Sequence, residues 1–165
     1  MPADDRRPVE VPFRSDLGGH LGFLLRLAHV DAFTRFHAAA GLSGAQVTEA
    51  TLLHLVALNP GIRQGVLARQ LRLKRAHMTK IVQGLEARGC LALDVPPEDR
   101  RSVTLRLTEG GQAALAGMWP AVERGEAAVQ AALAPADRAA ALALLSRMLA
   151  DPGTGEAAEG DADEP

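Results

Sequence analysis

Cysteine, aromatic side chains and long apolar runs are all scarce in this chain of 165 residues. The single cysteine, Cys90, excludes a framework of internal disulfides. No apolar run approaches the roughly 18 residues of a membrane span, so we expect no membrane partner. Residues 1–15 lack the apolar centre of a signal peptide, so we expect a cytoplasmic protein. The same residues hold three prolines, which predicts a flexible arm.

Aromatic residues are limited to four phenylalanines and one tryptophan, with no tyrosine. Because 47% of the residues are nevertheless hydrophobic, the core must consist mainly of leucine, alanine and valine. Such a core is typical of helices packed closely on helices. The length fits one domain with its own core, together with short tails.

The sequence also lacks the motifs of catalysis and of metal binding. It contains no glycine-rich phosphate loop and no G-x-S-x-G motif, and its Gly18-Gly19 and Gly110-Gly111 pairs read as helix boundaries. Its five histidines show no i, i+4 pair, and no C-x-x-C accompanies them. We therefore expect neither an enzyme nor a resident cofactor or metal.

The formal net charge of −2 conceals a strong local imbalance. Residues 151–165 carry six acids and no base, which predicts a disordered acidic tail. Between Gly61 and Leu107, by contrast, there are ten bases and four acids. This surplus favours contact with phosphates, although a solvated charged face would give the same count.

Helical periodicity of apolar residues predicts a long first helix from Asp16 to Ala40. Apolar side chains occupy more than one stripe of this helix, which indicates packing against both its own domain and a second subunit. An ordinary buried helix is the alternative interpretation. Ser43 and Gln46 then match the capping box of a second helix, which runs to about Leu58 and ends at the turn 59–61.

Two shorter helices, Gln64–Leu71 and Lys74–Arg88, follow that turn. The second has an aliphatic inner face and, after it, Gly89 as a left-handed cap. Its first turn and outer face carry mainly polar residues, which are Lys74, Arg75, Ala76, His77, Thr79, Lys80 and Gln83. Base edges in the DNA major groove offer partners for such side chains.

A β-hairpin is predicted next, because apolar and polar residues alternate through residues 91–94 and 103–107. Pro96-Pro97 must stop the pairing, since proline has no N–H to donate. The tip then projects Arg100 and Arg101, with Asp99 as an orienting partner. An arginine on such a loop can enter a narrow minor groove, whereas a surface ion pair of little consequence is the alternative.

The remaining residues predict two more helices. Thr108 is a plausible cap for a fifth helix to about Leu133, which Pro120 should kink or interrupt. Pro135 marks the start of a last helix, whose apolar stripe contains Leu142, Leu145 and Leu149. Helices so far from the basic segment would most simply pair two subunits.

The segment from about Ser43 to Leu115 resembles the MarR family of bacterial transcription regulators. The resemblance is carried by LNPGIRQGVLARQLRLKRAHMTKIVQGLEARG followed by PPEDRRSVTLRLTEGG. It implies a mainly α fold with a small β-hairpin wing, in a single domain at residues 16–150. Within it, a winged helix-turn-helix at 43–107 would be flanked by dimerisation helices at 16–40 and 109–150.

The resemblance further implies a homodimeric repressor on a palindromic operator in double-stranded DNA. Helix Lys74–Arg88 would be its recognition helix, and Arg100 or Arg101 its wing arginine. A small lipophilic or aromatic effector would modulate DNA affinity. By analogy with the family, the candidate residues of an effector pocket are His29, Phe33, His37, His54 and Trp119, each of which ordinary packing would also explain.

Two alternatives stay open at this point. Cys90 would serve as a redox switch if it were exposed and of low pKa, although a buried inert cysteine is the ordinary case. A winged-helix module that contacts only proteins is the other alternative. It predicts that Arg75, Lys80 and Arg100 can be neutralised without loss of function, whereas DNA binding predicts the opposite.

Overall fold

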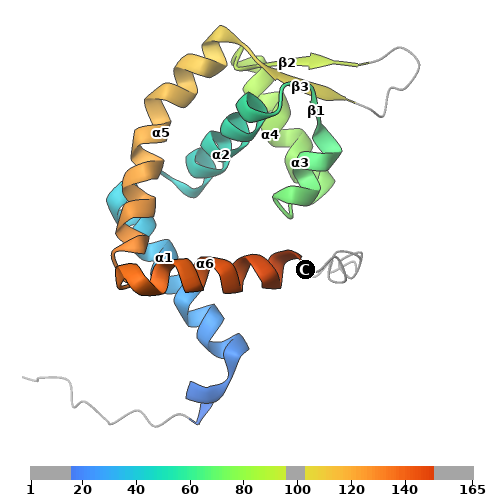
Figure 1. Cartoon of the computed structure of the whole chain (residues 1–165). Helices are drawn as coiled ribbons and strands as arrows, with labels where there is room; N and C mark the ends of the chain where they lie inside the picture. The colour runs from blue at the N-terminus through green and yellow to red at the C-terminus, as the bar shows by residue number, and fades with distance from the viewer. Residues whose placement is uncertain (1–15, 96–102, 151–165) are drawn as a thin grey trace, which may run out of the picture.

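The computed structural model describes residues 16–95 and 103–150, which are mainly helical with a small antiparallel sheet (Figure 1). The helices are α1 (Leu21–Ala40), α2 (Gly44–Leu58), α3 (Gln64–Gln70), α4 (Arg75–Ala87), α5 (Glu109–Gln130) and α6 (Pro135–Ala150). The strands are β1 (Ile62–Arg63), β2 (Leu91–Asp94) and β3 (Thr104–Leu107). This architecture confirms the predicted fold class.

One core lies between α2, α3, α4 and the sheet. Its largest fully buried side chains are Leu52, Leu53, Val56, Leu67, Met78, Val82, Leu85 and Leu105. Leucine and valine dominate it, as the shortage of aromatic residues requires. Because α4 packs on this core through one face only, its other face remains on the surface.

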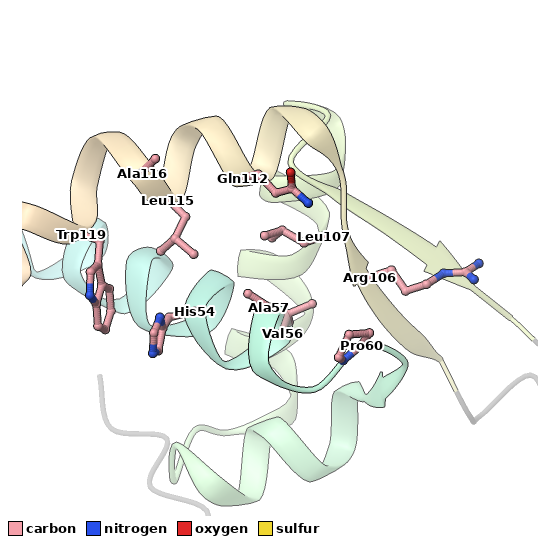
Figure 2. Close-up of a pocket in the computed structure, with 10 residues that line it drawn as sticks. All are labelled: His54, Val56, Ala57, Pro60, Arg106, Leu107, Gln112, Leu115, Ala116 and Trp119. Atoms are coloured by element: carbon pink, nitrogen blue, oxygen red, sulfur yellow. The ribbon is translucent and has the colours of Figure 1, made fainter.

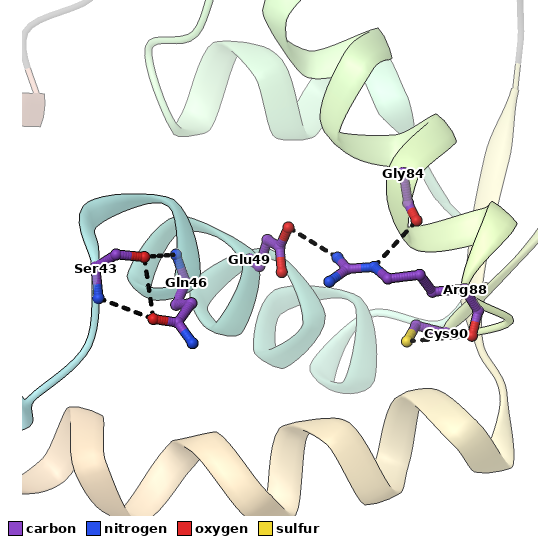
Figure 3. Close-up of polar contacts among 6 residues, drawn as sticks. All are labelled: Ser43, Gln46, Glu49, Gly84, Arg88 and Cys90. Carbon is purple, nitrogen blue, oxygen red and sulfur yellow. Dashed lines mark hydrogen bonds and ion pairs between the residues drawn. The ribbon is translucent and has the colours of Figure 1, made fainter.

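The helix boundaries follow local sequence signals closely. Gln46 N–H donates to Ser43 Oγ at 3.3 Å, while Ser43 N–H donates to Gln46 Oε1 at 2.9 Å, which is the predicted capping box (Figure 3). Gly41 ends α1 with φ 67°, and Gly89 follows α4 with φ 69°. Only glycine adopts this left-handed conformation without steric cost.

The sheet has the strand order β1-β3-β2. The predicted hairpin forms, with Leu93 opposite Leu105. Sequence periodicity did not predict β1, whose Ile62 also lies opposite Leu105 on the other side of β3. A two-residue strand carries no alternation, so its pairing depends on a segment more than 40 residues away.

Two expectations for the long helices need correction. The first helix begins at Leu21 rather than Asp16, because the 3₁₀ turn η1 (Leu17–Gly19) and its two glycines precede it. Of the two outcomes predicted for Pro120, the interruption is wrong, because α5 runs from Glu109 to Gln130 as one helix, which is bowed (Figure 1). Proline removes one backbone donor, and the rest of this long helix keeps its hydrogen bonds.

The first half of α5 packs against the core through Ala114, Leu115 and Met118, and its second half runs beyond it. Figure 1 shows α1 and α5 side by side, and the Phe36 ring of α1 packs over Gly125 of α5. Helices α5 and α6 meet at a bend of 105°. Among the described helices no single one is long and apolar enough to cross a membrane, and α5 and α6 meet that criterion only when counted together.

Candidate nucleic-acid interface

Helix α4 divides into an inner and an outer face. Met78, Val82 and Leu85 point into the core and are buried. Their spacing of i, i+4 and i+7 places them on one stripe of the helix, as a helix that docks through one face requires. The remaining surface of α4 is thereby held in a fixed orientation.

The structure places all seven predicted DNA-contact residues of this region on the exposed side. Lys74 is the N-cap of α4, and the other six, from Arg75 to Gln83, lie within the helix. Arg75, Thr79 and Gln83 follow one another at i, i+4 and i+8, so they form one line along the helix. No ion pair within the described residues engages Lys74, Arg75 or Lys80.

A hydrogen bond joins α3 to this outer face. The Gln64 side-chain amide donates to the Thr79 hydroxyl, with Nε2 and Oγ1 3.0 Å apart. Sequence patterns do not indicate this bond, because its partners are 15 residues apart on different helices. It fixes a side chain in the middle of the exposed line.

The wing is described only along its two arms. Arg106 on β3 lies 3.7 Å from Asp94 on β2, and both side chains are well exposed. The predicted tip residues Asp99, Arg100 and Arg101, and the Pro96-Pro97 pair, fall outside the described residues, as do the predicted arm and tail. Their roles therefore remain predictions from the sequence.

The end of α4 is tied to α2. The Arg88 guanidinium lies 2.8 Å from the Glu49 carboxylate, and Arg88 Nε donates to the Gly84 carbonyl at 3.2 Å (Figure 3). The hydrogen bond with Glu49 raises the pKa of Arg88. Cys90 follows in the chain and is buried, with its thiol 3.9 Å from the Arg88 carbonyl. This burial matches the expectation of an inert cysteine.

A cavity of about 440 Å³ opens between α2, β3 and α5 (Figure 2). His54 and Trp119 form one side, with their rings stacked at a centroid distance of 3.8 Å and an angle of 9°. Leu107 and Leu115 add apolar surface to the lining. Figure 2 shows the Arg106 guanidinium pointing away from the stacked rings. The cavity thus combines an aromatic wall with aliphatic side chains, which suits a small planar molecule.

The five predicted effector-pocket residues are not brought together in one place. His54 and Trp119 line this cavity, whereas His29, Phe33 and His37 lie along α1 and do not line it. On α1, the Phe33 ring lies 4.1 Å from the His37 ring, centroid to centroid. His37 Nδ1 lies 2.8 Å from the Leu42 carbonyl oxygen, so this histidine also has a role at the end of α1.

Comparisons with known proteins agree with this geometry. A family model described as the MarR family matches residues 40–102. A relative from Thauera aromatica, assigned as a transcriptional regulatory protein for the hcr operon, is 34% identical over 133 residues. That alignment covers 80% of each of the two chains.

Solved structures show a similarity over more than four fifths of the chain. The transcriptional repressor CouR, solved on a 23-mer DNA duplex, is 30% identical with a TM-score of 0.67, over 83% of this chain and 99% of its own. BpsR of Bordetella bronchiseptica, whose DNA binding is regulated by 6-hydroxynicotinic acid, is 25% identical with a TM-score of 0.68. That match covers 84% of this chain and 99% of BpsR.

Proposed function

Because the chain belongs to the MarR family of transcription regulators, we propose that it is a homodimeric repressor that binds a palindromic operator in double-stranded DNA. The family consists of DNA-binding regulators rather than enzymes. The observation that carries the proposal is the exposed line of Arg75, Thr79 and Gln83 on a helix fixed by its buried face. A rigid helix with a polar, basic outer face is the kind of element that enters a major groove.

The homodimer is supported by the apolar surface of the terminal helices. Among the described residues, large apolar side chains are exposed on both: Leu21, Leu24, Leu27, Val30 and Phe33 on α1, and Leu142, Leu144, Leu145, Met148 and Leu149 on α6. None of the described α6 side chains is buried. Large apolar side chains that gather on exposed helices are unfavourable in water and favour an interface with a partner.

In this proposal each subunit reads one half-site. Helix α4 occupies the major groove, and the wing reaches the neighbouring minor groove with Arg100 or Arg101, which Asp99 orients. A two-fold dimer places the two recognition helices on the same face of the duplex, about one helical turn apart. Lys74, Ala76, His77 and Lys80 then lie beside the central line and contact phosphates or base edges.

The direct test is fluorescence anisotropy of a duplex selected from a randomised library, titrated with protein over a salt series. Wild-type protein should bind tightly, and the double variant Arg75→Ala/Lys80→Ala should lose that affinity with a smaller salt slope, by about 0.9 for each phosphate that is no longer neutralised. Arg35→Ala on α1 is the matched control, because Arg35 pairs with Asp31 away from α4. A wild-type protein that selects no sequence would favour the protein-interaction module.

The wing is tested in the same assay with Arg100→Ala/Arg101→Ala. Loss of an arginine from the minor groove should reduce affinity most for duplexes with narrow A·T-rich flanks. Equal losses on A·T-rich and G·C-rich flanks would contradict minor-groove insertion and leave these arginines as phosphate contacts.

We also propose that the His54–Trp119 cavity binds the effector. Trp119 is the only tryptophan, so its emission reports on the cavity alone. Titration with 6-hydroxynicotinic acid, a small aromatic acid, should change this emission and weaken DNA binding in parallel. His54→Ala should abolish both responses while wild-type DNA affinity is kept, and His29→Ala on α1 serves as the control. A response that His29→Ala abolishes instead would move the site to α1.

A further inference from the structure

The contact between Gln64 and Thr79 holds a hydroxyl in the centre of the proposed reading face. Gln64 is the first residue of α3, and its backbone N–H donates to the Val103 carbonyl beside β3 at 2.9 Å. Its side-chain amide donates to Thr79 Oγ1 at 3.0 Å. Gln64 is half-buried, and its backbone hydrogen bond to Val103 holds it in place. Thr79 is exposed between Arg75 and Gln83.

Thr79 differs in this respect from the other threonines within the described helices. Thr34, Thr48 and Thr51 each donate their hydroxyl hydrogen to the carbonyl four residues earlier, at 2.8–2.9 Å. This back-bonding is a common arrangement for threonine in a helix. Thr79 makes no such bond among the described residues, and its oxygen instead accepts from Gln64.

This arrangement determines what Thr79 can offer to DNA. A hydroxyl has one hydrogen to donate, and its oxygen accepts through lone pairs. The Gln64 amide takes one of the two lone pairs and needs no hydrogen from Thr79, so the hydroxyl hydrogen is free to point away from the protein. We propose that Gln64 is a positioning residue that makes Thr79 a hydrogen-bond donor to the major groove. This inference rests on the proposed function of α4.

The proposal names the chemistry that Thr79 selects. Acceptors in the major groove are N7 and O6 of guanine, N7 of adenine and O4 of thymine, whereas the amines of adenine and cytosine donate. Thr79 should therefore prefer, at one position of each half-site, a base pair that presents an acceptor towards it. A single hydrogen bond of this kind gives about a fivefold preference in affinity.

The test reverses the direction of the hydrogen bond. In Gln64→Glu the residue at 64 is a carboxylate, which can only accept, so the Thr79 hydroxyl must donate to it and present lone pairs to DNA. Duplexes are selected from a randomised library with wild-type and variant protein, and affinities for single-base-pair variants are measured by anisotropy. The preference at one half-site position should change from an acceptor to the adenine or cytosine amine.

Three further variants separate this effect from others. Gln70→Glu adds the same charge to the exposed end of α3 without contacting Thr79, so it should lower affinity without changing the preferred base. Gln64→Met removes the hydrogen bond without adding charge and should flatten the preference. Thr79→Val should remove the preference as well, and combined with Gln64→Glu it should abolish the change. Thermal unfolding verifies that each variant is folded.

The outcomes distinguish this inference from the proposed function. If wild-type protein selects a sequence but Gln64→Glu and Thr79→Val select the same base at every position, the inference is wrong and the regulator remains. If Gln70→Glu changes the base preference as Gln64→Glu does, charge rather than hydroxyl orientation is the cause. A wild-type protein without any sequence preference overturns the proposed function itself.

Discussion

The guanidinium of Arg88 lies 2.8 Å from the carboxylate of Glu49 and so joins the end of α4 to the middle of α2 (Figure 3). The Arg88 side chain is 53% exposed and that of Glu49 is 24% exposed. Solvent therefore screens the pair in part, so that it adds little stability. Its main effect is to hold the end of α4 against α2. Together with the buried stripe, it gives α4 a second attachment to the domain.

A double-mutant cycle should measure this attachment. Glu49→Gln, Arg88→Met and the double variant should give a coupling of about 0.5 kcal/mol in the free energy of unfolding, because a partly exposed pair contributes little. The Asp31–Arg35 pair within α1 is the matched control and should show weaker coupling, since both side chains are more than half exposed. Equal coupling in the two pairs would contradict a structural role for Arg88.

The same pair should be insensitive to pH near neutrality. The hydrogen bond with Glu49 raises the pKa of Arg88. The contribution of the pair to stability is therefore fully present at any pH below the pKa that Arg88 has in the unfolded chain. It is lost only as pH rises through the still higher pKa of the folded protein. The coupling should therefore stay constant between about pH 6 and pH 9 when measured by urea unfolding. A coupling that falls over this range would show that another group titrates.

Two glycines of α5 should respond oppositely to alanine. A Cβ at Gly111 would overlap the Cys90 carbonyl oxygen and lie 2.8 Å from Leu107 Cδ1, whereas a Cβ at Gly117 meets nothing within 4 Å. Gly111→Ala should thus lower stability by about 1–3 kcal/mol. Gly117→Ala should raise it by about 0.5–1 kcal/mol through helix propensity. Chemical denaturation measures both, and a stable Gly111→Ala variant would show that the backbone at Cys90 can shift away from α5.

Local signals explain why much of the fold could be predicted from the sequence. The Ser43–Gln46 box and the Gly89 cap need only a few neighbouring residues, and the structure confirms both. The two-residue strand Ile62–Arg63 could not be found in this way, since its strand character comes entirely from pairing with β3. The continuity of α5 across Pro120 was not predictable for a related reason, because a long helix packed on α1 tolerates the loss of one donor.

The candidate site was predictable to a similar extent. Periodicity alone placed Lys80 opposite Met78 and Arg75 in the first turn of the helix, and both are exposed on α4 as expected. Pairwise contacts between helices carry no such pattern. The Gln64–Thr79 bond and the stacking of His54 on Trp119 arise only when separate helices pack, so neither could be inferred from spacing.

The turn between α3 and α4 should hold strain that glycine would relieve. Arg72 has φ 51°, and it is the only residue other than glycine with a positive φ among those described. This conformation costs about 1 kcal/mol for a side chain with a Cβ. Arg72→Gly should therefore raise the melting temperature, whereas Arg72→Lys should not. If Arg72→Gly also binds DNA more weakly, Arg72 is retained despite its strain because it contacts a phosphate. If Arg72→Gly is less stable than the wild type, Arg72 is not strained.

The apolar surface of α6 should hold two subunits together. Leu145 and Leu149 are 45% and 63% exposed on the described chain, an arrangement that a second subunit would relieve. Leu145→Asp/Leu149→Asp places charge in the proposed interface and should convert a dimer into a monomer by size-exclusion chromatography with light scattering. Leu58→Asp is the control, since Leu58 is 65% exposed and belongs to the end of α2 rather than to α1 or α6. Because two half-sites must be bound together for full affinity, the monomer should also lose operator binding while α4 stays intact. If the α6 variant stays dimeric, the contact must lie on α1 instead, where Leu24 and Leu27 offer the next pair to test.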